Sequence, residues 1–479
     1  MSHKMFSHKR TIFLYTILLS VCFLSGCAFT SDNVPQPEKQ PVITITLMDA
    51  CDLTEGVYNV SDEIFDMTLQ QWYEEHPEVG IQEKRVRSAD YFTYLSSYAT
   101  IGHGLPDVFI LPAGSIQAWS SCNLILDVTD AIDHSEEYAA YNIESLQPFI
   151  SNDLCYGFPL SNQSNTIIVY DKNIWDSIGY HDFPNNWADV IHANSQLQNM
   201  GYDCAIGFSN ADTYSPITYL LNQSSRKYCG AEWFDGLIAR DKQTMFTDDG
   251  FQNALSELKQ LYDSKIFPQD TLSSALDYFI EGHCPALILK TDSLYKLQQR
   301  LLEVSPERYS QLDFSFIPLY FQYETDVMNE DFTAAYATST GIEKALVINA
   351  AVANDPDRLK ACIEFCKYMT GSHYADNMTE QYGFKSFTKS DNSYSGNDPT
   401  WMRLLDCLYG EEATSSVINC KRMELFLGNG VWSTANSTLW DWLQGHDHSV
   451  NEIANYIQDC YEKYYMPKDL IYSKDMLVL

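Results

Sequence analysis

Along the first part of the chain, segments with an apolar residue at every second position take turns with segments in which apolar residues recur at helical spacing. Residues 42–48 alternate β-branched and polar side chains, which predicts a strand. Apolar residues at helical spacing in residues 61–72 and again in residues 91–99 predict two helices, and residues 79–86 and 107–111 predict two further strands. A strand–helix–strand–helix–strand order is typical of a parallel sheet that helices cover on both faces. We therefore expect the chain to open with an α/β lobe.

The same alternation continues in the second half. Strands are expected at residues 166–170, 285–289, 314–319 and 344–349, and helices at residues 186–200, 248–264, 355–370 and 449–464. The tail from residue 398 onward is predicted to be helical and rich in Trp. About 440 residues are too many for one core, because domains usually contain about 50 to 250. We expect two lobes of similar architecture, one formed by residues 42–160 and 319–371 and the other by residues 161–318 and 372–479.

The N-terminus has the organisation of an export signal. A basic start is followed by an apolar run at residues 11–24, which is shorter than the roughly 20 residues that a membrane-spanning helix needs. Leu24-Ser25-Gly26-Cys27 then resembles the lipobox of bacterial lipoproteins. This resemblance implies that residues 1–26 are a signal peptide and that Cys27 carries the lipid; an ordinary signal peptide with a chance Cys is the alternative. Three prolines in residues 27–41 favour a flexible tether.

The composition of the chain narrows the classes of molecule to which it could bind. The formal net charge of −34 disfavours nucleic acid and anionic lipid surfaces, and no second apolar stretch offers a membrane helix. The chain has 13 cysteines, of which Cys22 is expected to leave with the signal and Cys27 to carry lipid. An odd number of cysteines remains, so at least one of them is not part of a disulfide within the chain. Cys362 and Cys366 lie one turn apart on an apolar helix face and are expected to be buried. The disulfide pattern stays open.

Several segments, taken in order, resemble extracellular solute-binding proteins of the family 1 type, which serve carbohydrate ABC importers. These segments are Gly102-His103-Gly104-Leu105-Pro106-Asp107-Val108-Phe109, Tyr156-Gly157-Phe158-Pro159-Leu160 with Tyr170-Asp171-Lys172, Gly179 with Pro184 and Trp187, residues 279–287, residues 341–368, and Leu443-Gln444-Gly445. The resemblance implies an α/β fold of two Rossmann-like lobes joined by a hinge, the type II periplasmic-binding-protein arrangement. The ligand then binds in the cleft between the lobes, and closure presents it to a transporter.

From this we expect a monomeric substrate-binding lipoprotein that captures a small polar solute, a sugar or an oligosaccharide, and delivers it to ABC permease subunits. We expect no cofactor, no metal and no nucleic acid, and contact with the membrane only through the N-terminal lipid, outside the cytoplasm.

Sugar binding needs flat apolar rings and planar hydrogen-bonding groups. The candidates follow predicted strands or precede crossing segments: Asp49, Asp52, Ser115, Trp119, Ser161, Asn162, Gln163, Asn210, Asp212, Tyr214, Thr291, Asp292 and Ser339. The resemblance implies a ring-stacking role for Trp432. For each candidate a solvated loop, a hinge or core packing is the alternative. The chain departs from the sugar-binding pattern after Leu289, where Lys290 and Thr291 stand in place of a Trp.

Other functions are weighed against binding. A cysteine-dependent transferase on the same fold, similar to the thiaminase class, would use a thiol such as Cys51 or Cys155, but no His or strained turn singles one out. His446 and His448 lack further metal ligands nearby in the sequence. Polyamine or peptide binding, for import or for sensing, is the main alternative to sugar binding.

Overall fold

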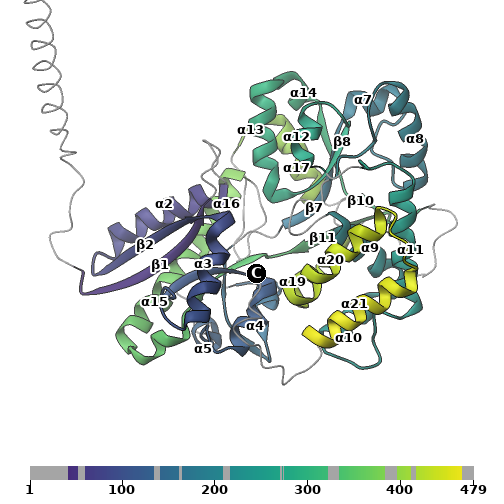
Figure 1. Ribbon diagram of the computed structural model, residues 1–479. Helices are drawn as coiled ribbons and strands as arrows, with labels where there is room; N and C mark the ends of the chain where they lie inside the picture. Colours follow the sequence, from purple (N-terminus) through teal and green to yellow (C-terminus); the bar gives the residue numbers. More distant parts are fainter. Residues whose placement is uncertain are drawn as a thin grey trace, which may run out of the picture. The chain divides into compact units, whose positions relative to one another are not determined.

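A computed structural model describes residues 41–51, 60–133, 141–160, 164–208, 216–269, 272, 274–321, 334–382, 396–410 and 417–465 (Figure 1). Residues Ile43–Leu479 form one compact unit by their contacts, distinct from Met1–Val42. The predicted signal peptide, Cys27 and almost all of the tether lie outside the described residues. Within the part of the chain that is described, no helix has the length and apolar character needed to cross a membrane.

The first sheet confirms the strands predicted at the start of the chain. It has the order β2-β1-β3-β12-β6. Its strands are β1 (Ile43–Cys51), β2 (Val79–Arg87), β3 (Val108–Pro112), β12 (Lys344–Ile348) and β6 (Phe158–Pro159). The pairs β1–β2 and β1–β3 are parallel, whereas β12 runs antiparallel to β3 and to β6. Because β1 and β3 are parallel, the residues that follow their carboxyl ends meet at one edge of the sheet.

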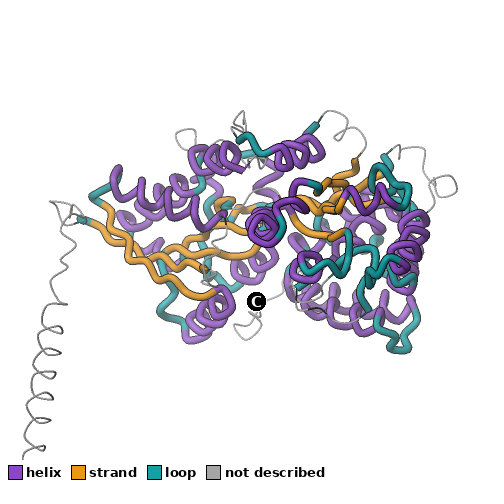
Figure 2. Tube along the Cα trace, turned by 90° about the horizontal axis from the view of Figure 1, so that it is seen from above, coloured by secondary structure: helices purple, strands orange, loops and turns teal. Residues whose placement is uncertain are grey.

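Helices lie on both sides of this sheet (Figure 2). They and the short elements of this half are α2 (Val60–Glu75), α3 (Ser88–Ile101), η1 (Ala113–Ser115), α4 (Ile116–Ser121), α5 (Thr129–Asp133), α6 (Ile143–Leu146), η2 (Gln147–Phe149), the hairpin β4–β5 (Ile150–Ser151 and Leu154–Cys155), η4 (Ala350–Asn354), α15 (Pro356–Met369) and α16 (Ser372–Tyr382). The helices α2, α3 and α15 cover the ranges that the apolar spacing predicted.

The second sheet differs from the expectation. Its path is β10-β11-β7-β8, with β13 added beside β11 and β9 beside β7. The strands are β7 (Ser164–Asp171), β8 (Ala286–Lys290), β9 (Leu312–Ser315), β10 (Ile317–Pro318), β11 (Tyr336–Gly341) and β13 (Val417–Lys421). Strand β7 runs antiparallel to β8, β9 and β11, and among the named strands of this sheet only β11 and β13 form a parallel pair. The expected repeat of the first sheet was therefore wrong, because apolar periodicity carries no information about strand direction.

Two local expectations in this half also need correction. The single strand predicted at residues 314–319 divides into β9 and β10, which pair with different neighbours. The tail predicted to be helical contains β13, whose side chains are mostly half-buried or exposed and so lack the apolar run of an inner strand. Helix α21 (Val450–Tyr464) matches its prediction, and Ser449 and Glu452 form a capping box at its start.

The remaining helices pack around the second sheet. They are α7 (Lys172–Ser177), α8 (Trp187–Asn199), α9 (Pro216–Cys229), α10 (Ala231–Ile238), α11 (Asp249–Asp263), α12 (Ala275–Ile280), η3 (Thr291–Ser293), α13 (Leu294–Val304), α14 (Pro306–Ser310), α17 (Pro399–Tyr409), α19 (Met423–Phe426) and α20 (Asn429–Leu443). Asn186 caps α8 by accepting a hydrogen bond from the Asp189 amide at 2.9 Å, a contact that fixes where this helix begins.

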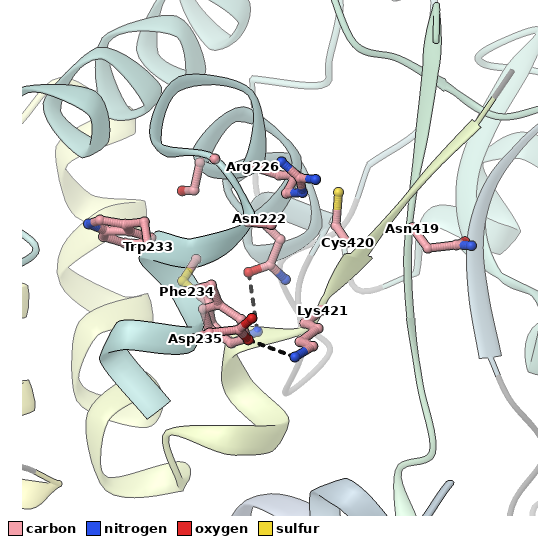
Figure 3. A pocket seen from close by; sticks show the side chains of 12 residues that line it. Asn222, Arg226, Trp233, Phe234, Asp235, Asn419, Cys420 and Lys421 are labelled. Carbon is pink, nitrogen blue, oxygen red and sulfur yellow. Dashed lines mark hydrogen bonds and ion pairs between the residues drawn. The ribbon is translucent and has the colours of Figure 1, made fainter. Parts of the chain in front are cut away.

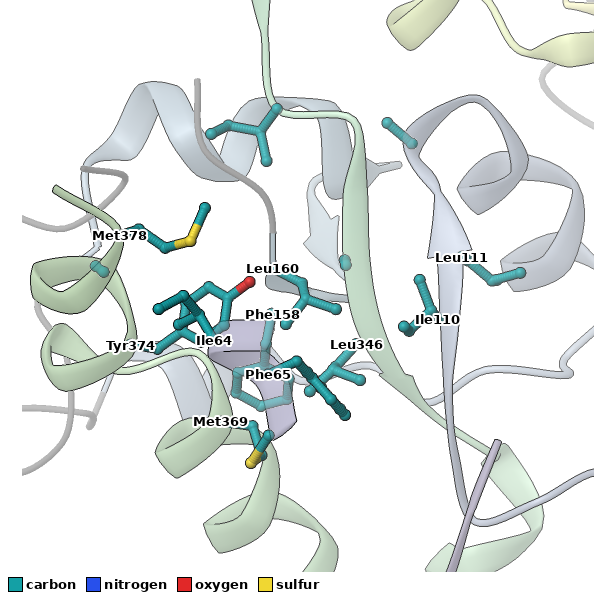
Figure 4. Packing of buried hydrophobic residues seen from close by; sticks show 14 of the residues in the cluster. Ile64, Phe65, Ile110, Leu111, Phe158, Leu160, Leu346, Met369, Tyr374 and Met378 are labelled. Carbon is teal, nitrogen blue, oxygen red and sulfur yellow. The ribbon is translucent and has the colours of Figure 1, made fainter. Parts of the chain in front are cut away.

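The first core is a mixture of aliphatic and aromatic side chains between the sheet and its helices (Figure 4). Ile64 and Phe65 of α2 lie there with Phe158 of β6 and Leu346 of β12, all at least 96% buried. Cys362 and Cys366 of α15 are fully buried in the same core, as predicted. Such a core tolerates truncation poorly, because replacing a buried Phe with Ala typically costs about 3–5 kcal/mol.

The chain passes between the two sheets at three places: β6 to β7, β11 to β12, and α16 to α17. These crossings bear on the predicted lobe ranges. Strand β11 lies within 319–371 but pairs in the second sheet, and α16 lies beyond residue 371 but packs against α2 of the first half. A division drawn by sheets therefore passes between Gly341 and Lys344. The lobe boundaries themselves stay a proposal.

Candidate functional site

Four charged side chains meet where two of the crossing segments come together. Glu343 lies in the short connection between β11 and β12, so it stands between the two sheets. It accepts hydrogen bonds from the Lys290 ammonium at 2.9 and 3.0 Å and from the Arg422 guanidinium. Arg422 follows β13 and also donates through Nε to Glu424 at 2.7 Å. We call Lys290, Glu343, Arg422 and Glu424 the junction cluster.

The junction cluster is buried and balanced in charge. Arg422 and Glu424 are at most 1% exposed, and Glu343 is 9% exposed. Burial opposes the ionisation of Glu343, but Lys290 and Arg422 outweigh it and hold the pKa of this carboxyl well below its usual range. The two cations and two anions that make up the cluster leave no net charge among its four members.

Helix α9 and the first sheet both reach the junction cluster. Asn222 of α9 donates to Glu424 at 3.1 Å and accepts from the Met423 amide at 3.4 Å. On the other side, the Ala113 amide of η1 donates to the Glu343 carbonyl at 2.8 Å. The segment η1 follows the carboxyl end of β3, and α19 packs against it. The junction cluster therefore ties the second sheet to the edge of the first sheet where ligand contacts were predicted.

Three predicted contacts lie on the first sheet's side of this region. Asp49 is 5% exposed near the end of β1 and forms an ion pair with Arg85 at 3.2 Å. Ser115 ends η1 and is 2% exposed. Trp119 is fully buried in α4, with its ring 5.5 Å from that of Phe109. In this conformation Trp119 offers no ring face to a ligand, which agrees with core packing, the alternative given for it.

Three more predicted contacts follow strands of the second sheet. The Thr291 hydroxyl accepts from the Asn165 amide at 3.1 Å, and the Ser339 hydroxyl donates to the Tyr219 carbonyl at 3.4 Å. Both residues are 1% exposed, so their hydroxyls hold neighbouring segments together. Asp292 is exposed and lies 3.2 Å from the Lys290 ammonium, which joins it to the junction cluster.

Trp432 of α20 was expected to stack on a sugar ring. It is 4% exposed within the second core, and its ring lies edge-on to Phe246 at 6.4 Å. Its indole Nε1 has no hydrogen-bond partner in the structure. In this conformation the ring faces are covered by protein, so a stacking role requires this part of the second core to open.

The other predicted contacts lie outside the described residues. They are Asp52, Ser161, Asn162, Gln163, Asn210, Asp212 and Tyr214. Ser161, Asn162 and Gln163 belong to the crossing from β6 to β7, and residues 209–215 precede α9, which carries Asn222.

Two of the hollows on the described surface can be outlined by their lining residues, and no predicted contact lines either. One of about 140 Å³ lies between α9, α10 and β13 (Figure 3). Trp233, Phe234 and Arg226 line it, and Lys421 forms an ion pair with Asp235 at 2.7 Å across its rim. The other, of about 640 Å³, lies beside Asp107 and Arg358, at the edge of the first sheet opposite the carboxyl ends of β1 and β3.

The junction cluster was missed by sequence reasoning. Its residues are far apart in the chain, and each is one of 94 charged residues. Among these four residues, only Lys290 stands at a position in the sequence that indicates a buried ion pair. It directly follows the apolar segment 285–289, and a Lys that points inward there needs a buried partner. The partners could not be named without the pairing of β8, β11 and β13.

A family model described as bacterial extracellular solute-binding protein matches residues 70–398, which is more than half of the chain. The protein belongs to the family of bacterial extracellular solute-binding proteins. The matched residues include most strands of both sheets, without β1 and β13, and the crossings from β6 to β7 and from β11 to β12. Membership confirms the resemblance inferred from the ordered segments.

Solved structures confirm the fold of this solute-binding protein. A chitin oligosaccharide binding protein matches with a TM-score of 0.69 at 15% identity, over 89% of this chain and 99% of that chain. The GacH receptor of Streptomyces glaucescens, solved unliganded and with acarbose, matches with a TM-score of 0.65 at 16% identity, over 88% and 98%. Maltose-bound MalE3 of T. maritima matches with a TM-score of 0.64 at 14% identity, over 87% and 99%. A search of curated protein sequences found no match. The predicted α/β fold of the type II periplasmic-binding-protein kind is thus confirmed.

Members of this family bind solutes, and the described residues offer little to the catalytic alternatives. Cys155 is 6% exposed, and its thiol donates to the Gly157 carbonyl at 3.5 Å. The side chain of Cys51 lies outside the described residues. Among the residues that can be described, no group of His, Cys, Asp and Glu is arranged to hold a metal ion, and His446 and His448 are exposed.

Proposed function

We propose that this solute-binding protein captures an oligosaccharide outside the cytoplasm and delivers it to the permease of an ABC importer. Family membership supports the capture of a solute. Three structural neighbours support a sugar as the ligand: a chitin oligosaccharide binding protein, a receptor solved with acarbose and a protein solved with maltose. The match covers 98–99% of the length of each.

The observation that carries the proposal is the charge-balanced junction cluster at the crossing of the sheets. A sugar is uncharged and is held by many hydrogen bonds and ring contacts. Segments that cross between two lobes act as hinges, because a few residues there absorb the change in backbone angles. A buried cluster that joins β8, the β11–β12 connection and β13 keeps these segments in register while adding no charge that would select an ion.

The contact residues proposed for the sugar are the sequence candidates around this junction. Asp49, Asp52, Ser115 and Ser161–Gln163 come from the first sheet's edge and its crossing, and Asn210, Asp212 and Tyr214 come from the stretch before α9. Thr291, Asp292, Ser339, Trp119 and Trp432 are proposed as well; of all the described candidates, Asp292 alone is exposed in this conformation.

The test is a thermal-shift and calorimetry panel on the chain without its signal. Chito-, malto- and xylo-oligosaccharides are compared with polyamines and short peptides. A ligand present at 100 times its Kd stabilises the folded state by about 2.7 kcal/mol, which raises the melting temperature by several degrees. A rise with one oligosaccharide series supports the proposal. A rise only with polyamines or peptides, or chemical conversion of the ligand, contradicts it.

We further propose that Cys27 is lipidated after removal of residues 1–26 and that the lipid holds the protein at the bacterial cell membrane. The expected result is that the protein sediments with membranes and takes up a labelled fatty acid, whereas Cys27→Ser is released without label. If Cys27→Ser sedimented with membranes and took up the label as wild type does, the lipid anchor would be contradicted. The sugar proposal would remain intact.

A further inference from the structure

Two cysteines distant in the sequence lie on neighbouring segments of the second lobe. Gly207 forms a parallel bridge with Leu287, and the Gly207 amide donates to the Ala286 carbonyl at 2.7 Å. Counting back three residues along each segment from this bridge reaches Cys204 and Cys284. The two segments therefore bring these cysteines side by side.

Contacts on the other side of the cysteines hold the same pairing. The Asp203 amide donates to the His283 carbonyl at 2.9 Å, and the two side chains form an ion pair at 2.9 Å when His283 is protonated. Tyr278 stacks on the His283 ring at 4.6 Å and donates to the Asp203 carboxylate at 2.9 Å. The segments are thus fixed both before and after the cysteines.

Both thiols are buried, and the Cys204 thiol donates to the Ile206 carbonyl at 3.4 Å. Cys204 is 1% exposed and Cys284 is fully buried. A Cβ placed on Gly207 would stand 2.8 Å from the Cys284 sulfur, so this thiol points toward the segment that carries Cys204. Burial, together with a hydrogen bond between the two thiols, raises the pKa of Cys284 well above its usual value.

We propose that Cys204 and Cys284 form a disulfide when the protein folds outside the cytoplasm. Cys204 and Cys284 lie outside the named strands, on two segments that backbone hydrogen bonds join at Asp203–His283 and Gly207–Ala286. Backbones paired in this way lie about 4.8 Å apart, and a disulfide spans Cα separations of about 4.4–6.8 Å. The two thiols lose two protons and two electrons as the S–S bond forms. A low-molecular-weight disulfide or an exported dithiol–disulfide oxidoreductase accepts them, and its own S–S bond is reduced to two thiols.

The timing of this reaction follows from burial. An attacking thiolate must reach the sulfur it exchanges with, and the folded protein covers both thiols. Oxidation therefore occurs while the chain folds, and the finished bond is protected from reductants. It closes a loop of chain that contains α9, α10, α11 and α12. This inference holds whatever solute the protein binds.

The deciding experiment folds the reduced chain in the presence of oxidised glutathione, blocks remaining thiols with iodoacetamide and digests without reduction. Cleavage after Lys and Arg places Cys204 in residues 173–226 and Cys284 in residues 266–290, each as the single cysteine of its peptide. The expected product is these two peptides joined, with the loss of two hydrogens. Recovery of both peptides separately with alkylated cysteines, or joined to other cysteines, overturns the proposal.

A second measurement follows stability in the same oxidised preparation. Adding a reductant during unfolding should lower the melting temperature by on the order of 5 °C, because opening a long loop restores entropy to the unfolded chain. The variant Cys204→Ser/Cys284→Ser should show no such response. Cys362→Ser/Cys366→Ser is the matched control, since its cysteines lie on one helix; it should respond as wild type does. Equal responses in the first variant and wild type contradict the disulfide.

Discussion

The second lobe contributes to two buried arrangements of charged side chains, and the two arrangements connect different kinds of segment. The junction cluster gathers charges from β8, from β13–α19 and from the β11–β12 connection, which crosses between the sheets. The other arrangement joins Lys227 of α9 to Glu257 of α11, with both side chains at most 6% exposed. Ser224 and Tyr228 also donate to the Glu257 carboxylate, at 2.8 and 2.9 Å.

The difference lies in what each arrangement holds. Lys227 and Glu257 fasten two helices that already pack along their length, so their ion pair adds to a contact that apolar residues make. The junction cluster fastens segments whose relative position decides how the sheets meet. Both arrangements should matter for stability, since a buried charge left alone is costly. Only the junction cluster should matter for ligand binding.

The largest effect is expected for Arg422→Met. The change leaves Glu343 with Lys290 alone and Glu424 with Asn222, both in a buried site, and should lower the free energy of unfolding by about 3–5 kcal/mol. Urea unfolding measures the loss. Lys421→Met is the matched control, because Lys421 is an adjacent residue with a half-exposed partner in Asp235, and its loss should stay within about 1 kcal/mol. Equal losses for the two variants would remove the distinction between the arrangements.

A loss of about 3 kcal/mol is expected for Lys227→Met, because Glu257 keeps its hydrogen bonds to Ser224 and Tyr228 but loses its cation. The informative measurement is calorimetric binding of the oligosaccharide selected by the panel. Lys227→Met should bind with wild-type affinity at a temperature where it is folded, whereas Arg422→Met should bind more weakly. A matching decrease in both would show that the helix arrangement is coupled to the site as well.

The pH dependence of stability should change in Glu343→Gln. The pKa of Glu343 is depressed in the folded protein, so its stabilising contribution is complete above the unfolded value of about 4.3 and is lost as the pH falls below it. This one group should cost wild type about 1.4 kcal/mol per pH unit below about pH 4. The variant should therefore show a shallower acid limb between pH 5 and pH 3 in urea unfolding. Parallel curves for the two proteins would mean that the carboxyl titrates normally.

The smallest effect is expected for Gly341→Ala, at the end of β11. A Cβ there would lie 2.4 Å from the Leu425 side chain of α19, so the crossing must shift. Overpacking of this kind costs about 1–3 kcal/mol. In a Leu425→Ala background the same change should cost less, because the obstructing methyl group is gone. A double-mutant cycle of unfolding free energies measures the coupling, and purely additive values would contradict it.

The sequence predicted those parts of the fold that depend on local apolar spacing. Helices α2, α11 and α21 and strands β1, β2 and β12 lie within a few residues of their predicted ranges. Strand direction in the second sheet was not predictable, because Ile168 and Ile288 are equally apolar in a parallel or an antiparallel pair. Strand β13 escaped notice because its exposed Lys421 and Asn419 interrupt the apolar pattern.

The detail of the candidate site was not predictable. Thr291 was predicted as a ligand contact after a strand and Ser339 before a crossing, and in the structure their hydroxyls bond to backbone atoms of β7 and α9. That outcome depends on side-chain direction, which a single sequence does not encode. Trp432 illustrates the same limit, since an aromatic residue at a helix start serves a core as well as a ligand.

The late position of β13 has a consequence for how the chain matures. This strand and the helices that follow it supply the outer neighbour of β11 and much of the second core, and Arg422 arrives with them. A growing chain therefore holds Glu343 and Lys290 without their guanidinium partner until the last part of it is made. The junction cluster is therefore complete only once β13 and the residues that follow it have docked beside β11.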